Sequence, residues 1–88
     1  MEPITRLERA INLARSIASD LWLYNREKVC EGIRHDNLFD SMASEIDEGL
    51  RWYRERVDPQ LDPNAEHFER AIVDVLVAKA ILQVEQDR

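Results

Sequence analysis

Apolar side chains recur at steps of three and four residues along most of this chain, and that spacing lines up one face of an α-helix. Only two glycines and three prolines occur among the 88 residues, so a fold built of strands would lack the turn residues that it needs. Helix-forming Ala, Leu, Glu and Arg are frequent. The sequence therefore predicts an all-α fold in which three long helices and one short helix form a small bundle.

Breaks in this periodicity place the expected helices. The first long helix covers about 4–24, and Asn25 is expected to cap a short helix at 26–33. A second long helix covers 37–57, and the third begins at Asp62-Pro63, which has the cap-then-proline order of a helix start. Because no linker, repeat or low-complexity segment interrupts the pattern, residues 1–88 are expected to form a single helical domain.

The last predicted helix carries more apolar surface than the edge of a small bundle needs. One stripe comprises Phe68, Ala71, Val75, Ala78 and Leu82. A second stripe comprises Ile72, Leu76, Ala80, Ile81 and Val84. Two stripes indicate either a central helix that the rest of the chain encloses or the seam of a dimer. We expect a homodimer and take Ile72, Leu76 and Ile81 as candidate partner-binding residues.

Aromatic residues form two clusters, Trp22 with Tyr24 and Trp52 with Tyr53, near the C-terminal ends of the first two long helices. Trp and Tyr combine a large apolar area with one hydrogen-bonding tip, which suits both the margin of a core and a protein interface. Trp22, Tyr24 and Trp52 are therefore further candidates for partner binding, with packing at the core edge as the alternative.

Residue patterns typical of enzymes do not occur in the sequence. The single Cys30 excludes an internal disulfide and a cysteine-based zinc site, and the two glycines are too far apart to form a phosphate-binding loop. No Glu-x-x-His pair of the kind that builds dinuclear metal sites in bundles occurs. We therefore expect a non-enzymatic protein with no catalytic residue, no metal site and no cofactor.

One alternative stays open, a metal- or ligand-binding bundle. It would use carboxylates and imidazoles that converge from several helices: Glu31, His35, Glu45, Glu48, Glu66 and His67. The net charge of −6 argues against general binding to nucleic acid, whose phosphates attract clustered Lys and Arg. No run approaches the ~20 apolar residues that span a bilayer, and no signal peptide is visible, so we expect a cytoplasmic protein without membrane contact.

The run Ser-Asp-Leu-Trp-Leu-Tyr-Asn-Arg-Glu-Lys-Val-Cys-Glu-Gly-Ile-Arg at 19–34 resembles a helical module of many bacterial proteins, which often sits at one end of longer multidomain chains. The resemblance continues through Glu48-Gly49 and Tyr53 to the helix that contains Phe68. It implies an accessory or interaction role and transfers no catalytic residue. The expected function is accordingly a protein-interaction or oligomerisation module that binds a protein partner or a second copy of itself.

Overall fold

The computed structural model describes residues 2–87 and confirms the all-α prediction. Its elements, in chain order, are α1 (Leu7–Tyr24), α2 (Arg26–Arg34), α3 (Leu38–Ser41), α4 (Ala43–Arg56), α5 (Glu66–Ala71), η1 (Ile72–Val77) and α6 (Ala78–Gln86). The last three follow one another without a break, so they form one long helix whose middle part, η1, is π-helical. The long helices are thus α1, α4 and the α5–η1–α6 helix, and α2 is the predicted short one.

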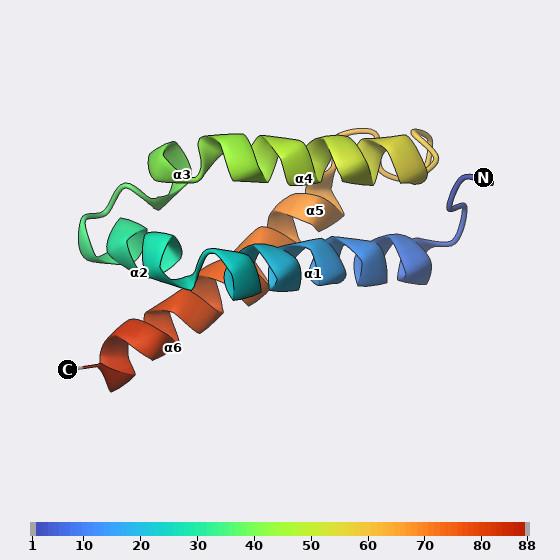
Figure 1. Cartoon of the computed structure of the whole chain (residues 1–88). Coiled ribbons are helices and arrows are strands. Elements are labelled where there is room, and N and C mark those ends of the chain that lie inside the picture. Colours follow the sequence, from blue (N-terminus) through green and yellow to red (C-terminus); the bar gives the residue numbers. More distant parts are fainter. Residues whose placement is uncertain (1, 88) are drawn as a thin grey trace.

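The molecule is an elongated bundle measuring 45 × 21 × 19 Å along its principal axes. Figure 1 shows α1 and α4 side by side and antiparallel, with the α5–η1–α6 helix crossing behind α1. Helix α1 contacts α4, α5 and η1, whereas α2 contacts α3 and α6. The α1–α4 pair is therefore covered by the last helix on one side only.

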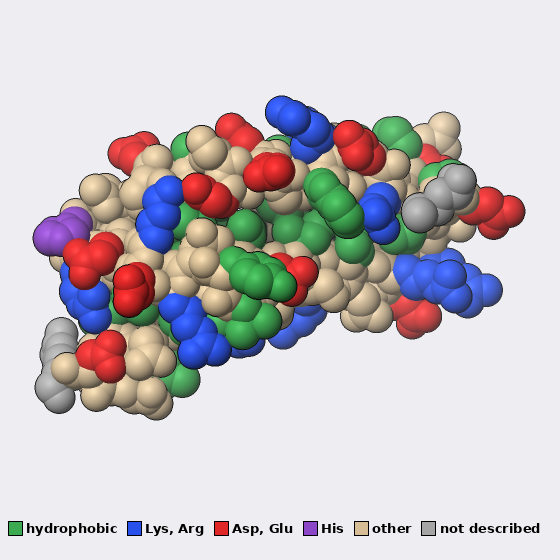
Figure 2. Space-filling model, viewed as in Figure 1, with side chains coloured by type: hydrophobic (Ala, Val, Ile, Leu, Met, Phe, Trp, Pro, Cys, Tyr) green, Lys and Arg blue, Asp and Glu red, His purple; other side chains and the backbone are tan. Residues whose placement is uncertain are grey.

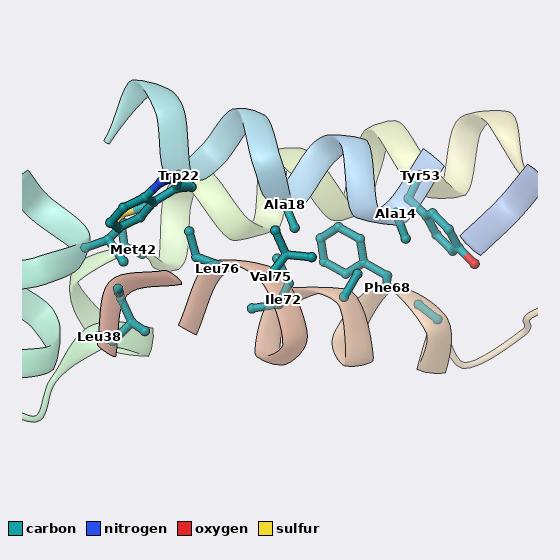
Figure 3. Packing of buried hydrophobic residues seen from close by; sticks show 14 of the residues in the cluster. Ala14, Ala18, Trp22, Leu38, Met42, Tyr53, Phe68, Ile72, Val75 and Leu76 are labelled. Carbon is teal, nitrogen blue, oxygen red and sulfur yellow. The ribbon is translucent and has the colours of Figure 1, made fainter. Parts of the chain in front are cut away.

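A row of small residues lets the last helix approach α1 closely. Ala10, Ala14 and Ala18 recur at steps of four and are fully buried. Figure 3 shows Phe68 and Val75 pointing from the last helix toward this row. Because alanine has only a methyl group, bulky side chains from the facing helix fill the space between the two backbones. The core is thus built mainly between α1 and the last helix.

Two helix starts differ from the predictions. Ile4 is not helical: its N–H donates to the Arg56 carbonyl (2.7 Å), and its own carbonyl accepts from the Asp58 N–H (2.9 Å). This extended pairing ties the beginning of the chain to the end of α4, so α1 begins only at Leu7. The last helix begins at Glu66 rather than at Asp62-Pro63.

Asp62 still caps the last helix, but from a longer distance along the chain. Its two carboxylate oxygens accept the backbone N–H groups of Glu66 (2.9 Å) and His67 (3.1 Å). The intervening residues form a turn that ends at Ala65, which has a positive φ of 53°. Asp62 thus accepts first-turn N–H groups as expected of a capping side chain, but Ala65 occupies the N-cap position, because a turn brings Asp62 back over the first helical N–H groups.

Asn25 occupies the predicted N-cap position of α2, but its side chain has a different role from the predicted one. Its side-chain Nδ2 donates to the Leu21 carbonyl (3.0 Å), and no side-chain cap forms at the start of α2. Carbonyls in the last turn of a helix have no intrahelical partner, so this bond satisfies one of them. The predicted N-cap position was therefore right, since the Asn25 carbonyl accepts the Val29 N–H (2.8 Å) at the start of α2, but the predicted side-chain cap was wrong because that side chain bonds back to α1.

Helix α2 ends in a Schellman motif. The Asn37 N–H donates to the Gly32 carbonyl (2.9 Å), and the Asp36 N–H donates to the Ile33 carbonyl (3.3 Å). Asp36 occupies the left-handed position of the motif with φ 55°. The chain then turns sharply into α3, which packs on α2, and a break at Met42 separates α3 from α4. The single helix predicted for 37–57 is therefore two.

The π-helical segment changes which apolar stripe of the last helix faces the core. A π-helix has more residues per turn than an α-helix, so positions after η1 are rotated relative to those before it. Phe68, Ala71 and Val75 of the first predicted stripe are buried, but Ala78 and Leu82 are exposed. Ala80, from the second stripe, is buried instead. Much of the surplus apolar surface is thus accommodated within the monomer.

Candidate interaction surfaces

The structure separates the predicted partner-binding residues into two groups. Trp22, Ile72 and Leu76 lie in the core, where α1 and the last helix meet, so they are not accessible on the folded monomer. Tyr24, Trp52 and Ile81 are exposed, with 84%, 50% and 43% of their surface accessible. A partner that binds the folded chain would therefore meet only the second group.

Tyr24 and Trp52 both line a groove between α1 and α4. The residues that line this α1–α4 groove are Ile17, Asp20, Leu21, Tyr24, Asn25, Glu45, Glu48, Gly49 and Trp52. Figure 2 shows apolar side chains exposed along the line where the two helices meet. Gly49 brings the helices close together, because a Cβ at this position would lie 2.9 Å from Ile17 Cγ2. The groove lies on the side of the pair opposite the core.

Negative charge borders the groove. Asp20, Glu45 and Glu48 contribute carboxylates to its lining, which contains no Lys or Arg. Lys28 donates to Glu45 Oε1 (2.8 Å), and this hydrogen bond lowers the pKa of the Glu45 carboxyl. The second oxygen of Glu45, Oε2, is enclosed and accepts no hydrogen bond from residues 2–87. The groove thus combines apolar side chains with ionised carboxylates.

The two aromatic side chains of the groove are held differently. The guanidinium of Arg56 lies 4.1 Å from the centre of the Trp52 ring, which is a cation–π distance. This contact covers one face of the indole and limits its motion. The Tyr24 side chain extends into solvent from the end of α1. Trp52 is therefore a pre-positioned contact, whereas the Tyr24 side chain is free to adapt.

A second apolar surface lies where α3 approaches the last helix. We call Phe39, Val73, Val77 and Ile81 the outer row. Val73, Val77 and Ile81 recur at steps of four, and Phe39 joins Val77 and Ile81 in lining one shallow hollow. Phe39 is 58% exposed and Val73 is 52% exposed. Neither Phe39 nor Val73 was among the predicted partner-binding residues, although the four-residue spacing from Val73 to Ile81 indicated a common helix face.

The six carboxylate and imidazole residues of the metal-binding alternative do not converge. Glu31 Oε2 lies 3.1 Å from His35 Nε2 on α2, but Glu45 pairs with Lys28. Glu66 and His67 lie at the start of α5. Within residues 2–87, no group of three or more His, Cys, Asp or Glu side chains is arranged to hold a metal ion.

Cys30 is the remaining reactive group. It is buried beside Arg34, whose guanidinium bonds Glu31 (2.9 Å) and Asp87 (3.4 Å) and so links α2 to the end of α6. Burial raises the pKa of the Cys30 thiol, although the nearby positive charge of Arg34 opposes this effect. A buried thiol with a raised pKa is a poor nucleophile, so Cys30 fits a packing role.

None of the helices within residues 2–87 combines the length and the apolar character that crossing a bilayer requires. The chain matches no protein-family model, no curated protein and no solved structure. Function is therefore inferred from the two exposed surfaces.

Proposed function

We propose that this chain is a non-enzymatic protein-interaction module that forms a homodimer through its outer row. The observation that carries this proposal is that Phe39, Val77 and Ile81 line one hollow, and that Val73, four residues before Val77, is exposed as well. Large apolar side chains that gather on a surface are typical of protein interfaces. We place the module in the cytoplasm, where a reduced, unpaired Cys30 is the expected state.

Two-fold symmetry suits this surface. In a dimer with a two-fold axis, the same patch of both copies meets itself, so a straight row of apolar residues is self-complementary when the two helices run antiparallel. Val77, in the middle of the row, would lie near the axis, and Phe39 would widen the contact beyond a single helix. Burial of the row in the dimer would also add to the modest core that a chain of this length can form.

Size-exclusion chromatography with light scattering tests the proposal. We expect a dimer at micromolar concentrations and a monomer for Val73→Glu and for Ile81→Glu, because a charge buried in the apolar contact has no partner. Leu82→Glu is the matched control: Leu82 is similarly exposed but lies outside the outer row. Circular dichroism checks that all three variants remain helical. A wild-type chain that stays monomeric, or dissociation by Leu82→Glu alone, would refute this dimer.

A further inference from the structure

The α1–α4 groove is the uncovered side of the bundle. The last helix packs on the other side of the α1–α4 pair, where Phe68 comes close to Gly49 (3.5 Å from the position that a Cβ would take). In Figure 1 that helix passes behind α1, and Figure 2 shows the groove from the front. Two antiparallel helices with one face covered leave a groove of the width that a further helix fills in four-helix bundles.

We propose that the α1–α4 groove binds a basic amphipathic helix of another protein. This inference rests on the proposed role as an interaction module, but it uses a surface separate from the outer row. The groove and the outer row share no residue, so the peptide-binding proposal and the dimer proposal can be refuted independently.

The apolar residues of the groove define one face of the bound helix. Ile17, Leu21 and Tyr24 follow one another at steps of four and three along α1, and Trp52 stands opposite them on α4. A helix that lies along this line needs large apolar side chains at i, i+3 or i+4, and i+7. Trp52, which Arg56 already holds in place, loses little side-chain entropy on binding and is the expected anchor.

The carboxylates define the charge of the bound helix. Asp20 and Glu48 form no ion pair or hydrogen bond with another side chain of residues 2–87, and both line the groove. Glu45 also lines the groove, but its charge is balanced by Lys28, so it offers the bound helix an unused acceptor oxygen, Oε2, rather than a third free charge. Lys or Arg residues that flank the apolar face of the bound helix would meet these charges. An acidic helix or a phosphate backbone would be repelled by them.

Two synthetic peptides of about 18 residues probe the groove, a length at which isolated helices begin to form. Both carry Leu on one helical face, and the opposite face is all Lys in one peptide and all Glu in the other. Binding is followed by NMR through the indole N–H signals of the two tryptophans. We expect the Lys peptide to shift the Trp52 signal with micromolar affinity and to leave the buried Trp22 signal nearly unchanged. We expect no binding of the Glu peptide.

Two double variants change the net charge of the protein equally, but only one of them changes the charge of the groove. Asp20→Asn with Glu48→Gln removes two carboxylates from the groove, and we expect the affinity for the Lys peptide to fall about tenfold. Asp47→Asn with Glu55→Gln removes two carboxylates from a different hollow on α4, and we expect less than about a twofold change.

Three results would overturn the proposal. They are equal losses of affinity in the two double variants, binding that leaves the Trp52 signal unmoved, and no binding of the Lys peptide at millimolar concentration. Light scattering on the same samples reports the oligomeric state separately. A dimer that ignores the peptide refutes only the groove, and a monomer that binds it refutes only the outer-row dimer.

Discussion

Replacing Gly32 with alanine should destabilise the fold even though alanine is the better helix former. A Cβ at this position would lie 2.7 Å from Leu38 Cα, 3.1 Å from its Cδ1 and 3.2 Å from its Cβ. Carbon atoms in favourable contact are about 3.5–4.0 Å apart. Leu38 Cα belongs to the backbone, and the neighbouring Asn37 N–H is hydrogen-bonded to the Gly32 carbonyl (2.9 Å). The new methyl group can therefore be accommodated only if α3 moves away from α2.

The expected magnitude follows from two opposing effects. Alanine gains about 1 kcal/mol over glycine inside a helix. Overpacking of a tight contact costs about 1–3 kcal/mol, and a clash with backbone belongs at the upper end of that range. We therefore expect Gly32→Ala to lower the free energy of unfolding by about 1–2 kcal/mol, which corresponds to a drop in Tm of about 4–16 °C for a domain of this size.

Gly49→Ala is the internal comparison, because its Cβ would meet a side chain instead of backbone. The nearest atom is Ile17 Cγ2 at 2.9 Å, and the next is Phe68 Cζ at 3.5 Å. Side chains adjust at lower cost, so the gain in helix propensity should roughly offset the strain and leave the unfolding free energy within about 0.5 kcal/mol of wild type. Urea unfolding followed by far-UV circular dichroism measures both variants. A Gly32→Ala protein as stable as wild type, or less affected than Gly49→Ala, would refute the reasoning.

Two further substitutions test local features of the fold by the same unfolding measurement. Asp36→Gly should stabilise the protein by about 0.5–1 kcal/mol, because Asp36 has a positive φ of 55° that glycine adopts without strain; a loss of stability would contradict the Schellman assignment. Tyr53→Phe should cost about 1–2 kcal/mol at neutral pH, because the Tyr53 hydroxyl donates to Asp62 Oδ2 (2.5 Å). Partial burial of Asp62 would raise its pKa, but the hydrogen bonds from Tyr53 and from two backbone N–H groups outweigh burial and lower it. The stability that ionised Asp62 contributes is therefore complete above its unfolded pKa of about 3.9 and is lost as pH falls through the lower folded value. The difference between wild type and Tyr53→Phe should accordingly shrink at acid pH, and a difference that stays constant would contradict this role of Asp62.

The sequence was sufficient to predict the features that depend on local pattern. Helical periodicity and the scarcity of glycine and proline led to the all-α class, and α2 differs from its predicted range by one residue. Asp62 was expected at the start of the last helix and does accept the Glu66 N–H, although Ala65 occupies the N-cap position. These predictions succeeded because each depends on residues that are neighbours along the chain.

The remaining features depend on contacts between distant segments. Ile4 pairs with Arg56 and Asp58 at the far end of α4, so the first helix begins at Leu7, three residues later than predicted. The π-helical segment shifts the buried face after Val77, which no count at a fixed period of 3.6 reveals. Trp22 was taken as a candidate contact although it continues the row of Ala10, Ala14 and Ala18 at the next step of four, which was a visible signal of its burial.

The positions of the exposed aromatic residues follow from how α1 divides its surface. Its buried side consists of Ala10, Ala14, Ala18 and Trp22, whereas its groove side consists of Ile17, Leu21 and Tyr24. Three long helices cannot cover both sides of an antiparallel pair, so in a chain of this length part of the apolar surface of α1 and α4 stays accessible. A partner that binds only the folded chain at such a surface stabilises it in proportion to the logarithm of the partner's concentration. The same feature that limits the stability of the isolated bundle thus provides the surface on which a further helix would dock.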